Sequence, residues 1–91
     1  MKKKDKKRHK IANLEYYIAK YTLPKLKKFQ KTTYSMPPDM NLEQWKEIIG
    51  EMIYGLEASA NQDWEFNKER DYKRVKKGLK LFGKYFRDLW I

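Results

Sequence analysis

The stretch DYKRVKKGLKLFGKYFRDLWI, residues 71–91, decides the fold of this 91-residue chain. Its apolar side chains recur at steps of three and four residues: Tyr72, Val75, Leu79, Phe82, Phe86 and Leu89. At about 100° per residue, this spacing places them on one side of a helix. The opposite side carries cations: Lys73, Lys76, Lys77, Lys80, Lys84 and Arg87. The stretch therefore predicts an amphipathic helix, expected over about residues 66–90, with one apolar and one cationic face.

A second helix is predicted over residues 42–58. Asn41 is a suitable N-cap, and Gln44 stands at the third helical position, from which its side chain can reach back to the cap. A wide apolar stripe follows: Leu42, Trp45, Ile48, Ile49, Met52, Ile53 and Leu56. Gly50 and Gly55 weaken such a helix, which suggests that another helix approaches closely at these positions, with local flexibility of the helix as the alternative.

A first helix is predicted over residues 11–33, because Leu14, Ile18 and Tyr21 also follow helical spacing. Pro24 removes a backbone donor, so this helix is expected to be kinked or split there. Residues 34–40, with Pro37 and Pro38, form the connector to the second helix. The expected fold is all-α: a small three- to four-helix bundle, with a single domain at residues 11–91 and a basic arm at residues 1–10.

The residue inventory argues against an enzyme. The chain has no cysteine, and its one histidine, His9, lies in the charged arm. Glu43, Glu47 and Glu51 form a row at helical spacing, but without further ligands the row favours pairing with lysines over metal binding. We therefore expect no catalytic site, no metal and no cofactor. The lack of cysteine favours an intracellular location, and the high charged fraction of 37% argues against a membrane protein.

Charge is the strongest functional signal. The net charge is +10, and the second helix is acidic whereas the segments around it are basic. A cationic surface attracts nucleic acid, since each neutralised phosphate releases counterions. The candidate binding residues are the six cations of the last helix and those of the arm: Lys2, Lys3, Lys4, Lys6, Lys7 and Arg8. Lysines carry little base readout, so binding without sequence preference to DNA or RNA is the first hypothesis. Four aromatic residues are candidates for stacking on bases: Tyr16, Tyr17, Tyr34 and Trp90. The simpler alternative is that the acidic helix pairs with its basic neighbours and the surplus charge keeps the protein soluble.

The apolar residues also resemble those of a family of small proteins coded by tailed bacteriophages and prophages. The likeness lies in Leu23-Pro24 with Leu26 and Phe29, Met36-Pro37 followed by Trp45, Met52-Ile53, and Gly78-Leu79-x-Leu81-Phe82-Gly83-Lys84-Tyr85-Phe86 leading to Leu89-Trp90. It covers roughly residues 20–90 and leaves out the arm. The resemblance implies a one-domain helical fold and a place in the cytoplasm of a bacterial host, and it brings no activity with it.

Two further functions stay open. A phage-type accessory factor would bind and modulate a host protein, for which the segment Leu89-Trp90-Ile91 offers an aromatic contact. The near-heptad repeat of the last helix, with Leu81 and Tyr85 as a second apolar edge, is compatible with a helical homo-oligomer of structural role. The expected state is a monomer or a small homo-oligomer.

Overall fold

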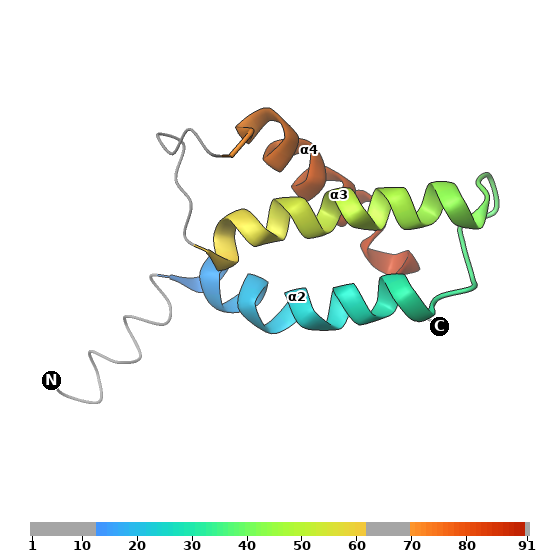
Figure 1. Ribbon diagram of the computed structural model, residues 1–91, viewed down its shortest axis with the longest axis horizontal. Coiled ribbons are helices and arrows are strands. Elements are labelled where there is room, and N and C mark those ends of the chain that lie inside the picture. Colours follow the sequence, from blue (N-terminus) through green and yellow to red (C-terminus); the bar gives the residue numbers. More distant parts are fainter. Residues whose placement is uncertain (1–12, 62–69, 91) are drawn as a thin grey trace, which may run out of the picture.

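The computed structural model describes residues 13–61 and 70–90. These contain three α-helices, α2 (Leu14–Thr32), α3 (Leu42–Ala60) and α4 (Tyr72–Lys84), followed by the short 3₁₀-helix η1 (Phe86–Asp88) (Figure 1). No strand occurs in the part of the chain that is described, so the predicted all-α class is confirmed. The basic arm of residues 1–10 lies outside the described residues.

The first helix, α2, is continuous through Pro24 and is not split there. Proline has no N–H group, so the Lys20 carbonyl lacks its usual helical hydrogen bond. Both Pro24 and Lys20 are exposed. Water can hydrate that carbonyl on the exposed side, which lets the helix continue. The helix ends where the Thr33 N–H donates to the Phe29 carbonyl at 2.8 Å, directly before the proline-rich connector.

The buried side of α2 differs from the apolar row of Leu14, Ile18 and Tyr21 from which the helix was predicted. Ala19 and Leu26 are buried and Leu23 packs against the core, whereas Ile18 is 48% and Tyr21 62% exposed. Because α2 packs on a single helix, it buries only a narrow stripe. Helical periodicity therefore identified the helix but not the face that it turns to the core.

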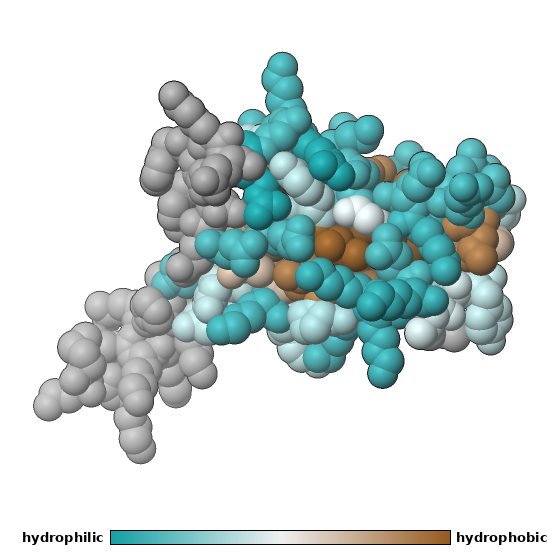
Figure 2. All heavy atoms as spheres, in the orientation of Figure 1, coloured by the Kyte–Doolittle hydropathy of each residue, from teal (hydrophilic) through white to brown (hydrophobic). Residues whose placement is uncertain are grey.

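The second helix, α3, is the centre of the structure. Both α2 and α4 pack on it, and no Cα atoms of α2 and α4 approach within 8 Å of each other. Trp45, Ile49 and Met52 are fully buried along it. In Figure 2 a hydrophobic seam between more hydrophilic side chains marks where α2 and α3 meet. Most of the core therefore comes from one helix.

The predicted capping box is present at the start of α3. The Gln44 N–H donates to Asn41 Oδ1 at 2.8 Å, and the Asn41 N–H donates to Gln44 Oε1 at 3.0 Å. Two backbone donors that the helix leaves without partners are thus satisfied.

The last helix is shorter than the predicted span of 66–90. Asp71 has extended backbone geometry and its Oδ1 accepts from the N–H groups of Lys73 and Arg74, so α4 begins at Tyr72. At the other end, the Asp88 N–H donates to the Tyr85 carbonyl at 2.9 Å, which tightens the chain into η1. The α-helical part consequently ends at Lys84.

Glycines set the distance between α3 and α4. A Cβ atom on Gly55 would lie 3.0 Å from the Leu79 nitrogen and from the Val75 oxygen, and a Cβ atom on Gly78 would overlap the Glu51 carbonyl oxygen. The close approach predicted at Gly55 is confirmed. At Gly50 the neighbour is a side chain of α2, because the amide nitrogen of Gln30 lies 3.2 Å from an added Cβ and donates to the Lys46 carbonyl.

This crossing corrects the predicted apolar face of α4. Gly78 and Val75 are buried against α3, with Phe82 and Tyr85 partly buried beside them. Leu79, expected in the core, is 39% exposed, and Phe86 is 59% exposed. The backbone approach at Gly78 rotates the helix so that these two side chains lie at the edge of the contact.

Candidate nucleic-acid interface

The cations predicted on the last helix form an exposed row, called here the lysine face: Lys73, Lys76, Lys77, Lys80 and Lys84 of α4, and Arg87 of η1. None of them forms a salt bridge with another residue of the described segments. At 1.5 Å per residue, Lys73 and Lys84 are roughly 16 Å apart along the helix, about the rise of five nucleotides in one DNA strand. The face is therefore long enough to meet several phosphates at once.

Two of the four acidic residues of α3, Glu51 and Glu57, pair with cations outside the lysine face. Arg74 donates from Nε to Glu51 Oε1 at 2.9 Å and from Nη2 to Glu51 Oε2 at 2.7 Å, and its guanidinium lies 4.0 Å from the centroid of the Tyr54 ring. Glu57 forms salt bridges with Lys27 at 3.5 Å and Arg70 at 3.8 Å. Two arginines, together with a lysine of α2, thus engage the carboxylates of Glu51 and Glu57.

The Arg74 hydrogen bonds hold the pKa of Glu51 below its usual value of 4.5, and the charge of Lys77 contributes in the same direction. Glu51 is therefore ionised at neutral pH and fixed beside α4. Of the lysine face, Lys77 is the member whose charge acts on this carboxylate.

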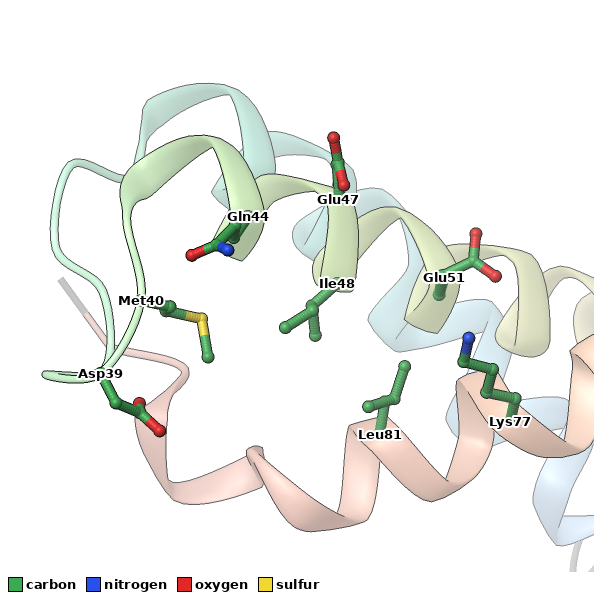
Figure 3. Close-up of a pocket in the computed structure, with 8 residues that line it drawn as sticks. All are labelled: Asp39, Met40, Gln44, Glu47, Ile48, Glu51, Lys77 and Leu81. Atoms are coloured by element: carbon green, nitrogen blue, oxygen red, sulfur yellow. The ribbon is translucent and has the colours of Figure 1, made fainter.

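A groove of about 410 Å³ separates α3 from α4 beside Lys77 (Figure 3). Met40, Ile48 and Leu81 point into it, while the carboxylates of Glu47 and Glu51 point away from its floor. Asp39 and Gln44 complete the lining. With an apolar floor and an acidic rim, this groove is a poor phosphate site, so it marks one border of the lysine face.

The cations of the arm, namely Lys2, Lys3, Lys4, Lys6, Lys7 and Arg8, lie outside the described residues. The structure therefore does not place them relative to the lysine face. Within residues 13–61 and 70–90, no three potential metal-ligating side chains come together, although Glu43, Glu47 and Glu51 share a flank of α3. None of the described helices has the length and apolar content needed to cross a membrane.

The four aromatic residues that are candidates for base stacking differ in how accessible their rings are. Tyr16 and Tyr17 pack edge to face at 5.0 Å, and the Tyr16 hydroxyl accepts from Lys20 at 3.0 Å. Tyr34 and Trp90 are instead strongly exposed. Trp90 lines a second cleft, together with Asp88 and the connector residues Ser35, Met36, Pro37 and Pro38. Sequence reasoning named Trp90 but missed the cleft, because the cleft forms only when the C-terminal segment folds against a connector about 50 residues away.

Comparisons with known proteins add no information on function. Comparison of the chain with protein-family models, with curated proteins and with solved structures finds no match, so its function is inferred from its own residues and geometry.

Proposed function

We propose that this protein binds nucleic acid without sequence preference through the lysine face of α4 and η1, with the basic arm of residues 1–10 adding further phosphate contacts. The protein acts without catalysis, in the cytoplasm of a bacterial host. For the whole chain we propose a small three- to four-helix bundle that carries this arm. The observation that supports the function best is that the lysine face is exposed and forms no salt bridge within the described residues, while Glu51 and Glu57 are engaged by other cations.

The physical basis is electrostatic. Each lysine that neutralises a phosphate releases condensed counterions, so affinity falls steeply with salt, with a slope near −0.9 per contact on duplex DNA. Lysine presents a mobile point charge and no rigid pattern of donors, so it reads the backbone and not the bases. The arrangement thus favours tight binding at low salt and little discrimination between sequences.

The test compares two variants of equal charge. The first reverses the lysine face through Lys73→Glu, Lys76→Glu, Lys80→Glu and Lys84→Glu. The control reverses exposed lysines of α2 through Lys20→Glu, Lys25→Glu, Lys28→Glu and Lys31→Glu. Affinity for a labelled duplex and a labelled single strand is measured by fluorescence anisotropy over a series of salt concentrations, with circular dichroism melts to check folding.

We expect binding by the lysine-face variant to weaken strongly but to stay measurable at low salt, and the control variant to keep most of its affinity. Loss of four phosphate contacts should lower the magnitude of the salt slope on duplex DNA by about 3.6. Removal of residues 2–10 should lower it further if the arm contributes. Absence of binding by the unaltered protein at low salt, or equal losses in both variants, would remove the proposal.

A homo-oligomer is the second proposal, supported by an exposed apolar row on α2: Leu14, Ile18 and Tyr21. Such a row at steps of four and three residues suits helix–helix packing between copies. Light scattering over a range of concentrations should then give a multiple of the 11.2 kDa chain mass, and Ile18→Lys should return the monomer. A monomer mass throughout would rule it out.

Host-protein binding, which rests on the phage resemblance, predicts a stoichiometric partner in a nuclease-treated pull-down, and an empty pull-down would count against it.

A further inference from the structure

The second cleft combines features that the lysine face lacks. It has a volume of about 310 Å³ and lies between the connector after α2 and the C-terminal segment after α4. This volume is at the lower end of the range for small-molecule sites, about 300–1,000 Å³. Its size therefore suits a single ring system rather than a long ligand.

The cleft is lined by an aromatic surface and apolar walls. The Trp90 side chain is 67% exposed, whereas Trp45 is fully buried in the core. Met36, Pro37 and Pro38 line the same cleft. An exposed indole beside apolar walls is a platform on which a planar ring can stack, and base–aromatic stacking of this kind tolerates any base.

Asp88 adds a carboxylate that can distinguish bases that carry an amino group from bases that do not. It is partly buried, and it has no ion pair with any residue of the described segments. The hydrogen bond from its N–H to the Tyr85 carbonyl holds it in η1. An ionised carboxylate only accepts hydrogen bonds. Cytosine, adenine and guanine carry an exocyclic amino group that donates, whereas thymine and uracil offer only a ring N3–H between two carbonyl oxygens, which repel a carboxylate.

Along the chain, the cleft residues Asp88 and Trp90 follow directly after the lysine face. Arg87 immediately precedes Asp88, and Lys84 closes α4 three residues earlier. Because Arg87 adjoins Asp88, a phosphate bound at Arg87 brings its nucleotide close to the cleft. A base is available for insertion only where it is not paired, as in a single strand.

Resting on the proposed function, we infer that the cleft of Trp90 and Asp88 holds one unpaired base with an exocyclic amino group, taken from a single strand of DNA or RNA whose phosphates lie along the lysine face. Trp90 stacks on the base, and Asp88 accepts a hydrogen bond from its amino group. The protein then prefers single strands to duplex and cytosine to thymine or uracil, while the lysine face alone has neither preference.

The test measures anisotropy with labelled 12-nucleotide strands of deoxycytidine, thymidine, cytidine and uridine, and with a mixed-sequence duplex, on the full chain near neutral pH. We expect deoxycytidine to bind at least about fivefold tighter than thymidine, since one good base contact discriminates by about 1–3 kcal/mol. The cytidine and uridine strands should show the same ratio, and comparison of the cytidine with the deoxycytidine strand shows whether RNA or DNA is preferred.

Two variants separate stacking from hydrogen bonding. Trp90→Leu should weaken all single strands about tenfold and leave the duplex unchanged, given stacking of about 1–3 kcal/mol per base. Phe86→Leu is the matched control, because Phe86 is an exposed aromatic that does not line the cleft. Asp88→Asn, whose amide can both donate and accept, should bring the cytosine-to-thymine ratio within about twofold. That ratio is insensitive to the change in net charge, since both strands experience it equally.

The outcomes distinguish the two proposals. If no nucleic acid binds, the proposed function and this inference both fail. If duplex and single strands bind with equal affinity, if cytosine and thymine are not distinguished, or if Phe86→Leu acts like Trp90→Leu, only the inference fails. Capture of an arginine-rich peptide that depends on Trp90 and Asp88, without base discrimination, would likewise overturn it in favour of a peptide site.

Discussion

Replacing Gly78 with alanine tests the contact that positions the lysine face. An added Cβ would overlap the Glu51 carbonyl oxygen of α3 and would lie 3.2 Å from the Gly55 nitrogen. Both neighbours are backbone atoms, so no rotamer change can relieve the overlap. The two helices must separate or rotate, which loosens the packing of Val75 against α3.

The magnitude follows from two opposing effects. Alanine is favoured over glycine inside a helix by about 1 kcal/mol. Overpacking costs about 1–3 kcal/mol and more where the backbone must shift, so the upper part of this range applies. We expect a net loss of about 2 kcal/mol in the free energy of unfolding, out of the roughly 5–15 kcal/mol of a typical domain. For a chain of this size, that loss lowers Tm by about 8–16 °C.

Urea unfolding followed by circular dichroism measures the change, with Gly83→Ala as the matched control. Gly83 lies in the same helix, and a Cβ there would meet no atom within 4 Å. Only the propensity effect applies, so this variant should be stabilised by up to about 1 kcal/mol. If Gly78→Ala were as stable as Gly83→Ala, the close crossing of α3 and α4 would be wrong.

Two further predictions concern Trp45 and Glu51. Trp45 is fully buried and its Nε1–H has no acceptor among the described residues, so Trp45→Ala should cost about 3–5 kcal/mol. Trp45→Phe should cost much less in the same urea experiment, because it removes an unsatisfied donor and keeps a ring against Tyr85; equal costs would contradict the packing described. Arg74 lowers the pKa of Glu51, so the stability that this carboxylate contributes is complete above its usual pKa of 4.5 and is lost as the pH falls through the lowered value. Thermal melts between about pH 7 and pH 3 should therefore show a weaker acid dependence for Glu51→Gln than for the unaltered protein, and parallel curves would contradict the Arg74–Glu51 pairing.

The candidate site was partly readable from the sequence. The cations of the last helix recur at helical spacing, and the structure does place those of α4 and η1 on an exposed face. That these cations form no ion pair with another described residue was not readable, because carboxylates of α3 are instead engaged by Arg74 and Arg70. The pairing partner that had been expected for the acidic row was lysine. Arginine takes Glu51 because its planar fork matches a carboxylate with two parallel hydrogen bonds.

The sequence by itself determined the features that depend on near neighbours along the chain. These are the helical class, the capping box at Asn41, and the connector with its two prolines, because hydrogen bonds and side-chain spacing within one or two turns decide them. Only the tertiary structure decided which face of each helix is buried. That choice depends on where another backbone comes closest, and the approach at Gly78 and Gly55 turned Leu79 and Phe86 outward. The cleft of Trp90 arose in the same way, since its walls come from segments that lie far apart in the chain and meet only when α4 crosses α3.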